Sequence, residues 1–321
     1  MRKIKRITPF LLLLSGITSA QEYKPHPLLS PMWQAETEYF TPSQIEDSTQ
    51  KNGFTGGAFN LRFPIYRGKD WLDAAGGHPY FAFIANTGVN ARQSQINYIE
   101  PDRLLTNYKL GITGLMATGP SSLRNLYMLQ VTTSSPAQDF RLAPRFHGAL
   151  IWRRLYHDNR LWHTIGITYT PVFGRDLPMP VIGAGYKINK ENQVQFTFPF
   201  NFVYTYLLSR QLSISGRLIN SGGYYRLQED IRQEEDYFYR YNYLRAALAV
   251  RYITDLNVVW TPEIGLTNKA HVQLDDTKNR QLSAIYFRLG MQVRFGKRPA
   301  ASPIMNFDPG DSGFDPSYLV E

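Results

Sequence analysis

The stretch from Ala284 to Phe295, AIYFRLGMQVRF, alternates between apolar and more polar side chains over 12 residues. Because successive side chains of a β-strand point to opposite faces, one face of this strand is apolar and the other is polar and partly charged. Strands of soluble sandwiches usually have about 5 or 6 residues, whereas a tilted strand that crosses a membrane has about 9 to 11. The length therefore favours a strand of a transmembrane β-barrel.

Residues 1–20 have the features of a secretory signal peptide. Four basic residues precede an apolar run over residues 10–14, and small residues at 18–20 offer a cleavage site before Gln21. A membrane anchor needs about 20 apolar residues, which this run does not reach. Removing the four basic residues, with no acidic ones, lowers the formal net charge from +9 to +5. A charge of this size does not indicate nucleic acid binding.

Composition narrows the function classes further. The 321 residues include no cysteine, which excludes a disulfide framework, a thiol nucleophile and a cysteine-based zinc site. After the first 20 residues no apolar run is long enough for a transmembrane helix. Aromatic residues make up 14% of the chain, with 21 tyrosines. This suits aromatic girdles at two membrane interfaces, although sandwich cores can also be rich in Tyr and Phe.

About fourteen stretches with strand character lie between Trp33 and Phe295. They predict an all-β fold, a closed antiparallel transmembrane β-barrel of about 14 strands. The organisation expected from this reading is a signal peptide over 1–20, a periplasmic lead-in over 21–32, the barrel over 33–295 and a flexible periplasmic tail over 296–321. The tail is rich in Pro and Asp. Two alternatives for it are binding a periplasmic partner and folding back into the lumen through Phe307, Phe314 and Tyr318.

The connections offer an independent check on the barrel. If both termini are periplasmic, short turns follow even strands and long loops follow odd ones. Most connections obey this rule, but 67–79 is long on the periplasmic side and 200–201 is very short on the outer side, so a count of 12 strands stays open. The expected tight turns are 157–160, 189–192, 208–211 and 254–255, and the expected long loops are 41–56, 90–107, 134–144, 220–242 and 269–283.

Two segments carry a resemblance to a known family. They are 177–187, LPMPVIGAGYK, and 194–199, VQFTFP. The chain from Trp33 to Phe295 resembles a family of uncharacterised outer-membrane β-barrel proteins from Bacteroidetes-type bacteria, a domain of unknown function. The resemblance implies location and fold, and it implies no catalytic residue. The chain departs from the usual ending, because 26 residues follow Phe295 where many barrels stop at a terminal aromatic residue.

Alternation also predicts which charged side chains face the lumen. Because the first and last strands of a closed barrel are neighbours, Glu36 and Glu38 are expected to pair with Arg288 and Arg294 across the seam. The remaining arginines either form a structural ladder, which is the slightly favoured interpretation, or line an anion-preferring passage. The predicted lumen-lining residues are Glu36, Glu38, Arg62, Arg217, Arg245, Arg251, Arg288 and Arg294.

Enzymatic motifs are not found in the sequence. There is no HExxH, no GxSxG and no P-loop pattern. The most plausible single base is His147, and a packed or interfacial role is the favoured interpretation for it. The prediction is that the protein is not an enzyme and has no catalytic, cofactor-binding or metal-binding residue. The histidines considered are His26, His78, His147, His157, His163 and His271.

The sequence therefore predicts a protein of the Gram-negative outer membrane with both termini in the periplasm. The first functional hypothesis is a passive or gated passage for small anionic solutes. The second is a closed barrel with a surface-binding or envelope-organising role. The expected partners are outer-membrane lipid and lipopolysaccharide, the barrel-insertion machinery and a small-solute ligand, with no nucleic acid.

Overall fold

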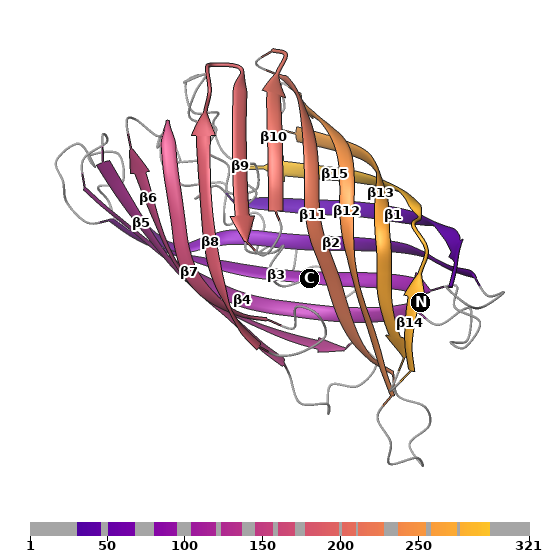
Figure 1. The fold of residues 1–321 in the computed structure, drawn as a ribbon. Coiled ribbons are helices and arrows are strands. Elements are labelled where there is room, and N and C mark those ends of the chain that lie inside the picture. The colour runs from indigo at the N-terminus through magenta and orange to yellow at the C-terminus, as the bar shows by residue number, and fades with distance from the viewer. Residues whose placement is uncertain are drawn as a thin grey trace, which may run out of the picture.

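The chain folds into one large antiparallel sheet that closes on itself (Figure 1). Within the part of the chain described here, no helix is long and apolar enough to cross a membrane. The computed structural model describes residues 31–45, 51–67, 80–94, 104–119, 123–136, 145–156, 160–170, 177–198, 201–209, 211–227, 237–254, 258–274 and 277–295.

Fifteen strands are found in these residues. Most have 10 to 17 residues, which is long enough to cross a membrane at a tilt. They are β1 (Met32–Gln44), β2 (Lys51–Arg67), β3 (Tyr80–Ser94), β4 (Leu104–Thr118), β5 (Leu123–Pro136), β6 (Arg145–Tyr156), β7 (Leu161–Thr170), β8 (Leu177–Lys187), β9 (Asn192–Phe198), β10 (Asn201–Leu207), β11 (Leu212–Leu227), β12 (Tyr237–Ile253), β13 (Val258–Leu274), β14 (Thr277–Gln281) and β15 (Ile285–Arg294).

The barrel closes between its first and last strands. β1 pairs with β15 in antiparallel register, and β15 pairs in turn with β13. The short β14 pairs only with the far end of β13, so it is an addition to the wall and not a member of the ring. The closed antiparallel barrel of 14 strands is therefore confirmed, and β14 is an element that the sequence did not predict.

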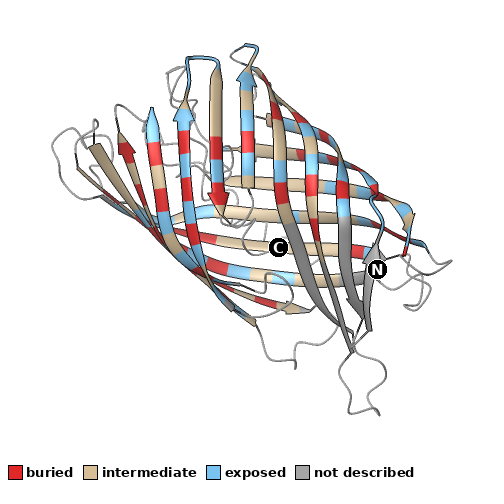
Figure 2. Cartoon of the chain, in the orientation of Figure 1, coloured by how far each residue is buried: buried red, intermediate tan, exposed pale blue. Residues whose placement is uncertain are grey.

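The alternation predicted for the last strand is present in the structure. Ile285, Phe287 and Leu289 are exposed on the outside of β15, whereas Tyr286 and Arg288 are buried. The same banding of buried and exposed positions recurs along the other strands (Figure 2). Each strand thus presents one face to the lumen and one to the surroundings of the barrel.

The structure decides the number of strands and shortens one expected loop. β9 ends at Phe198 and β10 begins at Asn201, with Thr197 opposite Asn201, so the very short connection is a genuine hairpin and the count is 14 and not 12. The expected loop 220–242 was too long, because β11 and β12 continue their ladder as far as Leu227 opposite Tyr237. Backbone pairing needs no apolar side chains. A strand can therefore be longer than the segment in which apolar and polar side chains alternate. Residues 68–79 lie outside the described residues.

Tight connections gather at one end of the barrel. Four residues separate β6 from β7, β8 from β9, β10 from β11 and β12 from β13. In the turn after β8 the Asn189 side-chain oxygen accepts hydrogen bonds from the backbone N–H groups of Glu191 and Asn192. This fits the turn chemistry of asparagine. The end that carries these connections is called the tight-turn end below.

Large apolar side chains cover the outside of the barrel. Along β7, Ile165, Ile167 and Tyr169 are each about half exposed, and β5 presents Leu129 and Val131 in the same way. Soluble proteins rarely expose a continuous apolar surface of this extent. An exterior of aliphatic and aromatic side chains on every barrel strand is the surface that contacts hydrocarbon in membrane barrels.

Candidate functional site

The inside of the wall carries a group of interlocked charged side chains. They come from six strands, which are β11, β12, β13, β15, β1 and β3. Because the first and last strands pair at this seam, residues more than 250 positions apart lie on neighbouring strands. This arginine–glutamate cluster consists of Glu36, Glu38, Arg92, Arg217, Arg245, Glu263 and Arg288.

Glu38 joins the two ends of the cluster. One carboxylate oxygen forms an ion pair with Nη2 of Arg92 on β3. The other oxygen lies 3.6 Å from Nη1 of Arg245 on β12. Both arginine side chains are buried. A carboxylate shared by two buried guanidinium groups offsets part of the cost of removing those charges from water.

Glu263 on β13 is the second centre of the cluster. One oxygen, Oε2, lies 3.1 Å from Nη2 of Arg288 and 3.4 Å from Nη1 of Arg217. The other oxygen accepts a hydrogen bond of 2.7 Å from the hydroxyl of Tyr286. Arg288 also places Nη1 3.8 Å from Oε2 of Glu36. Glu38 and Glu263 are thus each engaged through both oxygens and by two arginines.

Strand register explains why these residues meet. Arg288 lies opposite Glu38 on β1 and opposite Glu263 on β13, so three charged side chains occupy one row across three strands. In the neighbouring row, Tyr286 lies opposite Gly265. A Cβ atom at Gly265 would lie 2.7 Å from Cε1 of Tyr286, so the glycine gives the tyrosine ring room to lie along the wall.

Aromatic rings cover the cluster on the side away from the tight-turn end. Phe40 stacks on Phe54 with ring centroids 3.8 Å apart and on Tyr286 at 5.1 Å. Tyr243 adds a tilted contact with Phe40 at 5.3 Å. The Arg92 guanidinium lies 4.0 Å from the centroid of the Phe54 ring. This cation–π contact joins the aromatic rings to the arginine–glutamate cluster.

The structure brings together five of the eight lumen residues named from the sequence, Glu36, Glu38, Arg217, Arg245 and Arg288. Of the pairs expected across the seam, Arg288 with Glu36 is present, whereas the ion pairs of Glu38 are with Arg92 and Arg245 and not with Arg294. The other three lie elsewhere. Arg62 donates to Asn86 on β3 at 3.2 Å, Arg294 lies opposite Met32 near the tight-turn end, and Arg251 lies opposite Ser213 close to the same end.

Two members of the cluster were missed from the sequence. Arg92 fell inside the expected loop 90–107, because β3 runs on to Ser94. Glu263 lay within an expected strand, and its position between outward-facing Pro262 and Ile264 shows that it faces inward. The alternation rule alone could have found Glu263.

Basic side chains greatly outnumber acidic ones on the described inner face of the barrel. Among the side chains that the structure describes, alternation places twelve basic and three acidic residues on the inner face. The acidic residues all belong to the arginine–glutamate cluster. The basic ones are Arg62, Arg92, Lys109, Arg124, Arg145, Arg153, Lys187, Arg217, Arg245, Arg251, Arg288 and Arg294.

One pair of side chains resembles part of a hydrolase site. Nε2 of His147 on β6 lies 2.8 Å from Oγ of Ser134 on β5, and both residues are buried. A serine nucleophile needs a base that is itself oriented by a third group, commonly an acid. The three described inward-facing acids lie on β1 and β13, which are not neighbours of β5 or β6 in the sheet. No group of three or more His, Cys, Asp or Glu in the described ranges could hold a metal ion.

Comparisons with known proteins give fold-level similarity. No family model and no curated protein matches the chain. Among solved structures, the COG4313 outer membrane channel from Pseudomonas putida F1 is similar at a TM-score of 0.42 and 10% identity, over 87% of this chain and 100% of that one. The translocator domain of autotransporter NalP from Neisseria meningitidis has a TM-score of 0.26 and 9% identity, over 90% and 94%. The toluene transporter TodX from P. putida has 0.22 and 7%, over 84% and 91%.

Proposed function

We propose that the protein is an outer-membrane β-barrel that passes small anionic solutes. The observation that carries the proposal is the lumen charge, twelve basic against three acidic side chains in the described part of the wall. A passage lined by one sign of charge raises the local concentration of ions of the opposite sign. The apolar exterior supports the membrane part of the proposal, with lipid as the partner of that surface.

We also infer that the passage is closed at rest. Lumen-facing side chains on opposite parts of the wall, such as Val181, Trp162, Arg245 and Tyr286, are at most 2% exposed. Wall residues of a wide, water-filled pore would be accessible from the lumen. We therefore propose a gated passage. The same burial also favours the second candidate, a permanently closed barrel that acts through its outer surface.

We further propose that the tight-turn end lies in the periplasm. Short turns on the periplasmic side and longer connections on the outer side are typical of bacterial outer-membrane barrels. β1 begins and β15 ends at the tight-turn end, where Met32 lies opposite Arg294. Both ends of the barrel chain would then be periplasmic.

The test is the ionic current carried by the full mature chain in a planar bilayer under a salt gradient. Channel openings induced by voltage are expected to have a reversal potential of the sign that a higher permeability for anions than for cations produces. Arg153 and Arg154 provide a matched pair, because Arg153 faces the lumen and Arg154 faces outward on the same strand. Arg153→Gln should reduce anion selectivity, and Arg154→Gln should leave it unchanged.

Two results would contradict the proposal. Cation-selective openings would show that the basic lumen does not control permeation. A correctly folded barrel that passes no current at any voltage would favour the permanently closed barrel.

A further inference from the structure

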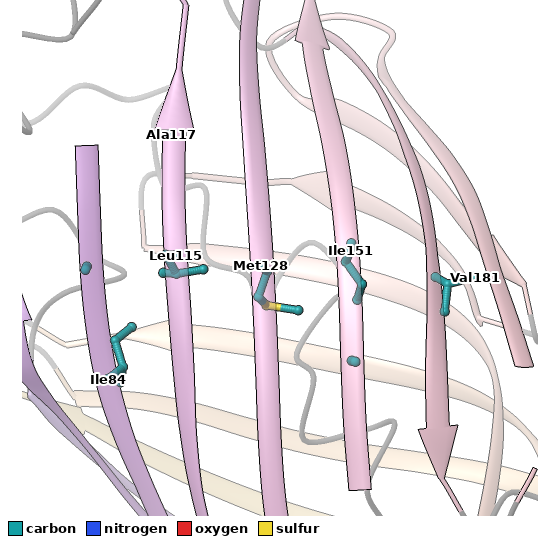
Figure 3. Close-up of a cluster of buried hydrophobic side chains, with 8 residues drawn as sticks. Ile84, Leu115, Ala117, Met128, Ile151 and Val181 are labelled. Atoms are coloured by element: carbon teal, nitrogen blue, oxygen red, sulfur yellow. The ribbon is translucent and has the colours of Figure 1, made fainter. Parts of the chain in front are cut away.

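The outer face of β5, β6 and β7 becomes polar near the tight-turn end. On the inner face of the same wall, Met128 of β5 and Ile151 of β6 belong to a buried apolar cluster (Figure 3). Among the described side chains of β3 to β10, Arg154 of β6 is the only charged one that faces outward. Charged side chains are costly on the lipid face of a barrel. The surroundings of Arg154 therefore indicate what this part of the surface binds.

Arg154 is the centre of a row of three polar side chains. Strand register places it opposite Asn125 on β5 and opposite His163 on β7. Each of the three residues is the third from the tight-turn end of its strand. Residues that lie opposite one another in an antiparallel pair point to the same face, so all three point outward. Because neighbouring strands are about 4.8 Å apart, this outer polar row is about 10 Å wide.

The outer polar row lies at the depth of the membrane interface. Leu150 is in the middle of β6, four residues before Arg154. Four residues span about 13 Å along a strand, which is about 10 Å along the membrane normal at a tilt of about 40°. The apolar band of an outer-membrane barrel is about 25 Å tall, so its edge is about 12 Å from the midplane. The row therefore lies next to the lipid headgroups.

Hydrogen bonds around the outer polar row use its acceptor atoms and leave its donors. The indole N–H of Trp152 donates to the side-chain oxygen of Asn125 at 3.2 Å. The amide N–H groups of Asn125 are thus left to other partners. The hydroxyl of Tyr156 lies 3.1 Å from Nδ1 of His163. With the hydroxyl as donor, the imidazole carries its hydrogen on Nε2, which becomes a further donor.

Arg154 has no acidic partner among the residues that the structure describes. Its guanidinium carbon lies 5.4 Å from the centroid of the Tyr156 ring. Its Nε makes no hydrogen bond to a described residue. A guanidinium can donate two parallel hydrogen bonds to one phosphate group. One positive charge between two neutral donors matches an anion that carries several oxygens.

Apolar side chains adjoin the outer polar row on the side toward the middle of the barrel. Leu129, Leu150 and Ile165 are between 50 and 56% exposed there. Acyl chains of a lipid whose phosphate lies at the row would run along this surface. A phospholipid would therefore contact both the polar and the apolar part, whereas a free phosphate ion would contact the row alone.

We propose that the outer polar row binds the phosphate of one phospholipid in the leaflet that faces the periplasm. Arg154, Asn125 and His163 donate to the phosphate and ester oxygens, and Trp152 and Tyr156 hold these donors in place. The choice of leaflet rests on the orientation proposed above, whereas the phosphate chemistry does not. The site lies on the outer face, so the inference goes beyond the passage and holds whether or not solutes cross the lumen.

Native mass spectrometry of the full mature chain in detergent tests the site. Dimyristoyl phosphatidylglycerol is compared with dimyristoyl glycerol, which has the same acyl chains and lacks the phosphate. The proposal predicts one phosphatidylglycerol molecule bound more tightly than any further ones, and no such molecule of the diacylglycerol. Equal binding of the two lipids would show that the apolar surface alone retains them and would overturn the proposal.

Two variants test the donors. Arg154→Gln should weaken the tightest phosphatidylglycerol about tenfold, the loss expected for one charge-assisted hydrogen bond. His163→Phe keeps a ring beside Trp152 and Tyr156 but removes the donor, and it should weaken the same lipid several-fold. An unchanged affinity in either variant would contradict the three-donor site.

Lys190→Gln is the matched control. Lys190 lies in an exposed turn at the tight-turn end, between β8 and β9, and its replacement changes the net charge by the same amount as Arg154→Gln. It should leave the affinity for phosphatidylglycerol unchanged. Equal losses in the two variants would show that overall charge, and not the outer polar row, attracts the lipid.

Two further measurements distinguish other occupants. Inorganic phosphate added at the concentration of the lipid should not displace it, and displacement would show that the row is a site for the free ion. A dimer that Arg154→Gln dissociates would show that a second copy of the chain covers the row, which would also overturn the proposal. The lipid affinity and the ionic current are separate readouts, because Arg154→Gln is expected to lower the first and to leave anion selectivity unchanged.

Discussion

Nη1 of Arg245 on β12 lies 3.6 Å from Oε2 of Glu38 on β1, although β13 and β15 stand between these strands in the wall. The contact spans the seam at which the chain closes its barrel. It shows that long charged side chains bridge the curved inner surface and do not pair only with the adjacent strand. The arginine–glutamate cluster therefore links the first strand of the barrel to its last three ring strands, β12, β13 and β15.

Replacing Glu38 with Gln should destabilise the barrel. Arg92 and Arg245 would lose their shared carboxylate while both remain buried. Leaving buried charges uncompensated costs about 3 kcal/mol. The measurement is urea unfolding of the protein in lipid vesicles. Glu191→Gln, in an exposed turn, is the control and should change stability by less than about 1 kcal/mol.

The bridge can be isolated with a double-mutant cycle. Glu38→Gln, Arg245→Gln and the double variant should give a coupling free energy of about 1 to 3 kcal/mol. Additive effects would show that the 3.6 Å contact contributes nothing to stability.

Replacing Gly265 with Ala should also destabilise the barrel. The new methyl group would clash with the backbone oxygen of Ala246 and lie 2.7 Å from the Tyr286 ring, so the β12 backbone or the ring, which donates a hydrogen bond to Glu263, would have to shift. Overpacking of this kind costs about 1 to 3 kcal/mol. Gly290 is a matched control on β15, because a methyl group there finds its nearest neighbours in Thr261 at 3.7 Å. Equal unfolding midpoints for the two variants would contradict the prediction.

The fold was largely predictable from the sequence. Each strand of a wall between lipid and lumen needs apolar and polar side chains that alternate with a period of two residues. In β15 this period placed Tyr286 and Arg288 correctly on the inner face. It failed where strands extend past the apolar belt, as in β11 and β12, since both faces there can be polar. The loss of Arg92 from the predicted site has the same cause.

The pairing inside the lumen was less predictable. The sequence places Glu36 beside Arg288, because closure makes their strands neighbours. It does not reveal that Arg245 reaches Glu38 across two intervening strands, because this depends on wall curvature and side-chain length. The Ser134 contact of His147 likewise needs the exact register of β5 and β6, which hydropathy does not supply.

Anion selectivity should weaken as salt rises. Fixed charges act over about 10 Å at 0.1 M salt but only about 3 Å at 1 M. If the basic lumen wall selects solutes through its field, the reversal potential per unit salt gradient should shrink between these two conditions. The measurement uses the same full chain in planar bilayers at both ionic strengths. A selectivity that does not change with salt would indicate that pore width, and not lumen charge, discriminates between ions.

Replacing outward-facing Leu150 with Arg should oppose folding into a bilayer. Leu150 lies in the middle of β6 and is 56% exposed. An arginine on the lipid face costs about 2 to 4 kcal/mol near the midplane and about 0 to 1 near the interface. Leu161→Arg, at the tight-turn end of β7, is the control and should cost less. Both variants are unfolded with urea from lipid vesicles. If the exterior contacted water, Leu150→Arg would cost no more than Leu161→Arg, because a surface charge in water is nearly neutral for stability.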